Sequence, residues 1–436
     1  MSSLLRLPDV HDLEYMTDKI KLRRWVAIVA LLAMAAGNVL TLWNTREGMR
    51  QGYGDFLAFY TAGVLVRTGM ARDLYNPALQ WKIQQEVAPE VQTHHGPLLF
   101  MRPPFEALLF ALFSLEPYAV SLILWTIVKL ILLAAIPFLA MPGGAAHLPR
   151  MAVFPLLLGT FPVFMDLLLG QDAILLAFLF ALCFWHLRKN SEVTAGLILG
   201  LALFKFQLVV PFLVATWISG RRSVLRGFII SALAVIAISA LVVGPKNLLH
   251  YPGYLLTLSQ ASGIGIALES QINFRGLLAL FAGPRGLSAF VPIILAALAL
   301  LAVVGAGLAW RKTKNHLLAE GVALALVAAT VTSYYANDYD LLLLIIPLLA
   351  VIGRDEGVPD QASLATQSHV EERRGRNMGL VGTILLLLTP VYWLAKRHSA
   401  ECLMVLPLLA VGFALTYKLV KEGQPEDVLR REGLPK

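Results

Sequence analysis

Ionisable side chains that lie beside long apolar runs are the residues of this chain best suited to chemistry. The carboxylates among them can act as general bases, and the Lys and Arg side chains can hold a phosphate group. A charge near hydrocarbon is costly and usually faces a cavity or a partner, so we expect these side chains to surround one polar site. The topology predicted below places all of them on one side of a membrane: Asp55, Arg72, Asp73, His94, His95, Arg102, Glu106, Asp172, Lys205, Glu269, Arg275, Asp338 and Asp340.

Asp55 is the candidate general base. It follows the first apolar run by about a dozen residues and comes directly after Gly-Tyr-Gly. A carboxylate at the membrane surface can accept a proton from an attacking hydroxyl. Asp55 also begins an amphipathic segment over residues 55–69, where a carboxylate can cap free helix amides. Both interpretations stay open on the sequence alone.

Lys205 and Arg102 are candidate anion contacts. Lys205 lies within the apolar segment 194–217, which is predicted to form two short helices that meet at this residue. The N-terminus of the second helix would favour an anion beside the ammonium. Arg102 precedes two prolines, and Glu106 follows it by one helical turn. For both cations, phosphate binding and a structural ion pair remain alternatives.

Other chemistries have no signature in this sequence. It contains no Gly-x-Ser-x-Gly elbow, no His-Glu-x-x-His motif and no Walker motif. His94 and His95 are adjacent, which is poor spacing for metal ligands, and Cys183 and Cys402 lie inside apolar runs. We therefore predict no metal site and no use of an aqueous nucleotide. A carboxylate and several cations in lipid suit a lipid-linked phosphate substrate.

The composition predicts the membrane scaffold that must position these residues. The chain has 436 residues, of which 58% are apolar and only 15% are charged, whereas soluble domains are about one quarter charged. Many apolar residues gather in runs of about twenty, the length that crosses a bilayer. The net charge of +8 is explained by basic cytoplasmic turns, so we expect no nucleic-acid partner.

Basic turns fall at every second junction between apolar runs, which predicts an all-α polytopic protein with both termini cytoplasmic. We expect about 10–13 transmembrane helices, short broken helices included, and two amphipathic surface helices in the first outer loop. The predicted regions are a cytoplasmic N-terminus (1–24), a first span (25–43), an extracytoplasmic catalytic loop (44–104), a transmembrane core (105–352), a cytoplasmic loop (353–377), a C-terminal hairpin (378–420) and a cytoplasmic tail (421–436).

Several segments resemble a known family. They are GDFLAFYTAGVLVRTGMARDLYNP, RPPFEALLFALFSLEPYAVSLILWTIVKL, GQDAILLAFLFAL, AGLILGLALFKFQLVVPFLV and YDLLLLIIPLL, in this order. They resemble the polyprenol-phosphate-mannose-dependent mannosyltransferases of the DUF2029 type, in the GT-C superfamily of membrane glycosyltransferases. The resemblance covers about residues 25–350. It implies a GT-C-like fold and transfer of a sugar, usually mannose or arabinose, from a polyprenyl phosphate donor to an extracytoplasmic glycan or glycolipid.

The resemblance also implies roles for particular residues. The family's catalytic aspartate falls on Asp55, its broken-helix lysine on Lys205, and its Gly-Gln turn on Gly170 and Gln171. Members often carry a histidine near the late outer turn, where this chain has SYYANDYD, so Asn337 or Asp338 is expected to substitute. The other substrate contacts are expected from Tyr60, Asp73, Gln171, Asp172 and Glu269.

The implied reaction is a single displacement with inversion. Asp55 would deprotonate the acceptor hydroxyl, while Lys205, Arg102 or Arg275 would hold the charge of the departing lipid phosphate. We expect no cofactor and no obligatory divalent metal, because these cations can meet the leaving-group charge. A transporter or flippase of lipid-linked saccharides, and a non-catalytic membrane subunit, remain alternative functions.

Overall fold

A computed structural model of the protein describes residues 10–89, 97–141, 149–260, 268–282, 291–313, 317–353, 388–398 and 400–422. Within these ranges the chain forms helices and no strand. An isolated bridge between Thr160 and Leu388 is the only strand-type pairing found there. The predicted all-α fold is therefore confirmed.

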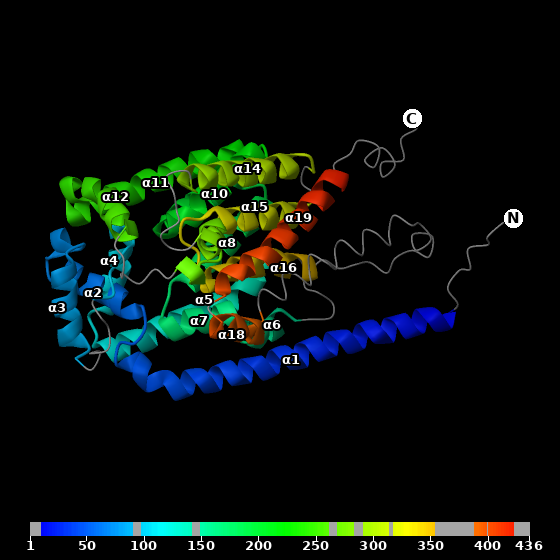
Figure 1. The fold of residues 1–436 in the computed structure, drawn as a ribbon, viewed down its shortest axis with the longest axis horizontal. Helices are drawn as coiled ribbons and strands as arrows, with labels where there is room; N and C mark the ends of the chain where they lie inside the picture. Colours follow the sequence, from blue (N-terminus) through cyan, green and yellow to red (C-terminus); the bar gives the residue numbers. More distant parts are fainter. Residues whose placement is uncertain are drawn as a thin grey trace.

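Six apolar segments of the described ranges are long enough to cross a membrane, which takes ~20 residues. They are Trp25–Arg50 within α1 (Val10–Arg50), α5 (Tyr118–Ala140), Glu192–Ile218, α11 (Arg222–Val243), α14 (Val291–Arg311) and Glu401–Lys421, which holds η6 (Glu401–Met404) and most of α19 (Val405–Glu422). The chain is thus a multi-pass membrane protein. Figure 1 shows α1 running along one side of the helix bundle.

Shorter helices fill the bundle between the long ones. Nearly every residue of α15 (Leu318–Thr332) is buried, because its small and apolar side chains pack on all sides. The other short helices are α6 (Arg150–Leu158), α7 (Phe161–Leu169), α8 (Ala173–Arg188), η4 (Asp338–Leu344), α16 (Ile345–Ile352) and α18 (Thr389–Arg397). Residues 354–387, which include most of the predicted cytoplasmic loop, lie outside the described ranges.

The segment Glu192–Ile218 folds back on itself as α9 (Glu192–Leu201), η2 (Ala202–Lys205) and α10 (Phe206–Ile218). Arg221, just beyond its end, lies 3.4 Å from Glu192 at its start, whereas a straight helix of 27 residues would be ~40 Å long. α9 packs on α11 where Gly196 meets the backbone of Val224. The predicted pair of short helices is confirmed, with Lys205 at the point where they meet.

An outer layer covers one end of the bundle and contains α2 (Phe56–Arg67), η1 (Ala71–Asp73), α3 (Pro77–Val87), α4 (Pro104–Phe113) and α12 (Pro245–Gln260) (Figure 1). α3 begins as predicted, because Asn76 accepts from two backbone amides and Pro77 occupies the first position. α2 differs from its predicted surface position, since apolar residues on every face bury it against α4. This layer has its own core around Phe56, Phe59 and Phe110, against which Trp125 of α5 also packs.

Candidate active site

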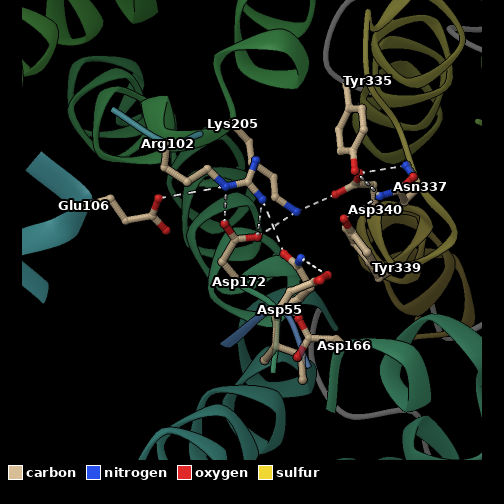
Figure 2. Close-up of polar contacts among 12 residues, drawn as sticks. Asp55, Arg102, Glu106, Asp166, Asp172, Lys205, Tyr335, Asn337, Tyr339 and Asp340 are labelled. Carbon is tan, nitrogen blue, oxygen red and sulfur yellow. Dashed lines mark hydrogen bonds and ion pairs between the residues drawn. The ribbon is translucent and has the colours of Figure 1, made fainter. Parts of the chain in front are cut away.

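A cluster of buried ion pairs lies where the outer layer meets the bundle (Figure 2). The Asp172 carboxylate lies 2.9 Å from Nε of Arg102 and 2.8 Å from Nζ of Lys205. Nζ of Lys205 also donates to Oδ1 of Asp340 at 2.6 Å. Asp172, Lys205 and Asp340 are at most 1% exposed. We call Arg102, Asp172, Lys205 and Asp340 the charged cluster.

Four separate elements bring the charged cluster together. Lys205 ends η2, at the turn of the α9–α10 hairpin, and Asp340 lies in η4. Asp172 lies in the turn between α7 and α8, and Arg102 directly precedes α4. Burial alone raises the pKa of the Asp172 carboxyl, but the adjacent Arg102 and Lys205 outweigh this effect and hold the pKa below its usual value. Asp172 is therefore an ionised centre between two cations.

Asp55 lies beside the charged cluster and stays partly exposed. It directly precedes α2, but its side chain makes no capping hydrogen bond. Instead Oδ2 of Asp55 accepts a hydrogen bond of 2.6 Å from Nε2 of Gln171. Burial raises the pKa of the Asp55 carboxyl, and the Gln171 hydrogen bond and Arg102 partly offset this rise. The capping interpretation is not supported by these contacts, and a partly exposed carboxylate with a raised pKa suits a proton acceptor.

The turn that carries Gln171 is held from two sides. Nε1 of Trp125 donates to the carbonyl oxygen of Gly170 at 3.1 Å. Asp166, one helical turn earlier, forms a fully buried ion pair with Lys129 at 2.8 Å and accepts from the Ile174 amide. An intramembrane ion pair of this kind is costly to break, so it holds the end of α7 and the start of α8 in place.

Replacing Gly170 with Ala is expected to destabilise this turn. Gly170 has a φ of +70°, and an added Cβ would come within 2.6 Å of Phe56 Cβ. The left-handed backbone alone costs an L-residue roughly 1–2 kcal/mol, and the clash adds to this. Gly69 is a matched control, because it has a φ of +79° and open space around the new Cβ. Melting temperatures in detergent should fall further for Gly170→Ala than for Gly69→Ala; equal falls would contradict the assigned contact.

In residues 98–102, the segment that leads to Arg102, backbone N–H and C=O groups form hydrogen bonds with side chains and not with a neighbouring strand. Three tyrosine hydroxyls donate to three successive carbonyl oxygens: Tyr254 to Phe100, Tyr251 to Met101 and Tyr75 to Arg102, at 3.3, 3.0 and 2.8 Å. Gln80 and Gln84, one turn apart on α3, bond the same segment at Phe100 and Leu98. The extended segment thereby holds the Arg102 guanidinium against Asp172.

Glu106 is a buried acid at the edge of the charged cluster. It is 2% exposed and lies 4.0 Å from Nε of Arg102, and neither of its carboxyl oxygens has a hydrogen-bond partner among the described residues. Burial and the nearby Asp172 charge raise the pKa of Glu106 well above its usual value. A neutral Glu106 avoids placing a second buried negative charge beside the ionised Asp172 carboxylate. The predicted pair with Arg102 is thus present, but Asp172 is the closer partner of the arginine.

The late turn before η4 forms the other wall of the site. Nε2 of Gln271 donates to Oδ1 of Asn337 at 2.8 Å, and the Asn337 amide donates to the hydroxyls of Tyr335 and Tyr339. The ring of Tyr339 lies 4.7 Å from Nζ of Lys205, a cation–π distance. Asn337 therefore organises aromatic residues around the charged cluster.

Asp338 faces Lys396, at the end of α18, with 3.3 Å between its carboxylate and Nζ. Burial raises the pKa of the Asp338 carboxyl, and the Lys396 ammonium partly offsets the rise. Helix α18 thus contributes a cation at the late turn.

No hydrogen bond or ion pair joins the charged cluster to three of the predicted site residues, Tyr60, Asp73 and Arg275, within the described structure. The Tyr60 hydroxyl donates to the Glu116 carbonyl oxygen inside the outer layer, and Asp73 is exposed in η1. Arg275, on α13 (Phe274–Ala282), stacks on the Tyr334 ring at 4.1 Å and has no ion pair among the described residues. The side chain of Glu269, in η3 (Leu268–Ser270), lies outside the described part of the chain, as do His94 and His95.

The Lys129–Asp166 pair and Lys396 are not among the site residues predicted from the sequence. A lysine and an aspartate within apolar runs are a signal of pairing, and this signal was present at residues 129 and 166. Lys396 begins a Lys-Arg-His run on a predicted outer turn, where the positive-inside rule gives no reason for basic residues. In the described residues no group of three or more His, Cys, Asp or Glu side chains is placed to hold a metal ion.

The fold and site define a class: a multi-pass membrane protein with a partly exposed carboxylate beside buried ion pairs. The sequence profile of glycosyltransferase family 87 matches residues 100–347, more than half of the chain. The chain belongs to this family, and it is therefore a membrane-embedded glycosyltransferase. No curated protein and no solved structure matches it. The matched range contains the whole charged cluster, and it begins after Asp55 and ends before Lys396.

Proposed function

We propose that the protein transfers a sugar, with mannose as the first candidate, from a polyprenyl phosphate to a glycan or glycolipid acceptor. The reaction would occur at the extracytoplasmic face of the cell (inner) membrane, with both termini cytoplasmic. Membership of glycosyltransferase family 87 supports sugar transfer. The observation that carries the site assignment is Asp55, a partly exposed carboxylate held by Gln171 beside Arg102.

In the proposed reaction Asp55 accepts the proton of the acceptor hydroxyl as that oxygen bonds to the anomeric carbon. The bond between the anomeric carbon and the lipid phosphate oxygen breaks in the same step, and the polyprenyl phosphate leaves as an anion. Attack from the face opposite the leaving group inverts the configuration. No cofactor takes part in this scheme.

The leaving phosphate needs a cation that is not already neutralised. Lys205 is 1% exposed and paired with two carboxylates, which is the ion-pair alternative that the sequence left open. We propose that Lys205 keeps the charged cluster assembled and that Arg275 provides the main phosphate contact. Nη1 of Arg275 has no hydrogen-bond partner in the described part of the chain, and guanidinium groups bind phosphate in a bidentate manner. Arg102, 11% exposed, would be the second contact.

A comparison of donors tests the proposed donor class. Purified protein in lipid nanodiscs would receive a glycolipid acceptor with either polyprenyl-phosphate mannose or GDP-mannose, and products would be measured by mass spectrometry. We expect new glycolipid only from the lipid-linked donor. Transfer from the nucleotide sugar alone would contradict the proposal. Arg275→Gln should raise the KM for the lipid donor, with Arg72→Gln, exposed in η1, as a matched control.

A further inference from the structure

Gln171 contacts both a cation and the candidate base. Its Nε2 donates to Oδ2 of Asp55 at 2.6 Å, and its Oε1 accepts from Nη2 of Arg102 at 3.4 Å. These two contacts determine which way the amide points. A flipped amide would set its NH2 group against a guanidinium, which only donates, and its oxygen against a carboxylate, which only accepts.

The contact distinguishes the two oxygens of Asp55. Oδ2 is occupied by Gln171, and no hydrogen bond reaches Oδ1 from the described residues. An acceptor hydroxyl would therefore meet Oδ1. The side chain of Gln171 is itself 5% exposed and held by the turn at Gly170. It is poorly placed to contact a sugar, in contrast to the substrate-contact role predicted from the sequence.

We infer that Gln171 is a positioning residue that orients the Asp55 carboxylate and presents Oδ1 to the acceptor hydroxyl, an inference that rests on the proposed function. The amide donates to the ionised form of Asp55 and so favours that form over the protonated one. Gln171 thus offsets part of the effect of burial and keeps the base ionised over a wider pH range.

Several other charged groups affect the pKa of Asp55, so a test of Gln171 must leave them unchanged. Arg102, which precedes α4, favours the ionised form, whereas Asp172 and Asp338 oppose it. Asp55 also interacts electrostatically with three tyrosines, which lie on α5, in the late turn and in η4: Tyr118, Tyr335 and Tyr339. None of these residues is changed in the variants below.

The test compares Gln171→Leu with Gln51→Leu. Gln51 lies in the turn after α1, and its side chain makes no hydrogen bond within the described residues. The first measurement follows the protonated carboxyl band of ligand-free protein by infrared spectroscopy against pH, with Asp55→Asn used to assign the band. Loss of the amide donor favours the protonated carboxyl, so we expect its titration to move up by about one pH unit in Gln171→Leu. Gln51→Leu should titrate as the unchanged protein does.

The second measurement is the pH profile of sugar transfer. The acidic limb of kcat/KM should move to higher pH by the same amount, so that Gln171→Leu loses most activity at low pH and recovers part of it at high pH. A purely structural role would lower kcat at all pH values without moving the limb. An unmoved titration and an unmoved limb would overturn the inference. A shifted titration in protein that transfers no sugar from polyprenyl phosphate would instead contradict the proposed function alone.

Discussion

Asp55→Asn is expected to abolish sugar transfer in protein that remains folded. Asparagine keeps the size of the side chain and its contact with Gln171, but it cannot accept a proton from the acceptor hydroxyl. Loss of a general base typically lowers a rate by about 10²–10⁴-fold. Because Asp55 is not paired with a cation by an ion pair in the described structure, we expect the melting temperature to change little. Initial rates with saturating donor would measure the effect.

Glu86→Gln is the matched control for this substitution. Glu86 lies in the same outer layer, is exposed on α3 and has no contact with the charged cluster in the described residues. It should keep its transfer rate within a few-fold of the unchanged protein. If Asp55→Asn retained a near-normal rate, the assignment of Asp55 as the base would be wrong.

Among the substitutions proposed here, Lys205→Met is expected to cause the largest loss of stability. Lys205 forms ion pairs with both Asp172 and Asp340, at 2.8 and 2.6 Å, and all three side chains are buried. Removing one partner of a buried ion pair leaves the other charge uncompensated. We therefore expect the free energy of unfolding to fall by about 3–5 kcal/mol. Thermal unfolding in detergent, followed by intrinsic fluorescence, would measure the loss as a lower melting temperature.

A second substitution distinguishes lost charge balance from lost packing. Lys205→Met combined with Asp340→Asn removes one positive and one negative charge, so part of the stability should return. Lys396→Met serves as a control, because the Lys396 side chain is 34% exposed and a partly solvated pair contributes little. If Lys205→Met had the same melting temperature as the unchanged protein, Lys205 would not be the residue that holds the charged cluster together.

Features set by local pattern were predictable from the sequence. The α9–α10 hairpin followed from basic turns on both sides of a segment too short to cross twice as full spans, and Arg221 does meet Glu192. The N-cap at Asn76 was predictable because Asn is favoured at the N-cap of a helix and Pro at its first position. The surface position predicted for α2 was wrong, because the sequence of this helix does not reveal that α4 covers its second face.

The partners of each charge were not predictable, because they lie far apart along the chain. Lys205 and Asp340 are separated by 135 positions in the sequence, and Gln171 and Asp55 by 116. Which cation pairs with which carboxylate depends on the packing of the hairpin, the α7–α8 turn and η4, and no spacing rule encodes that packing. The sequence therefore placed Lys205 at the site but left its role open between phosphate binding and an ion pair.

The measurement that tests the central claim most directly is analysis of the products made from a β-linked polyprenyl-phosphate mannose in proteoliposomes. The proposed reaction predicts one new glycosidic bond for each polyprenyl phosphate released, with α configuration at the transferred sugar. Mass spectrometry would count the two products, and NMR would determine the anomeric configuration. Intact donor moved across the bilayer with no new bond, or a β-linked product, would contradict a single displacement assisted by Asp55.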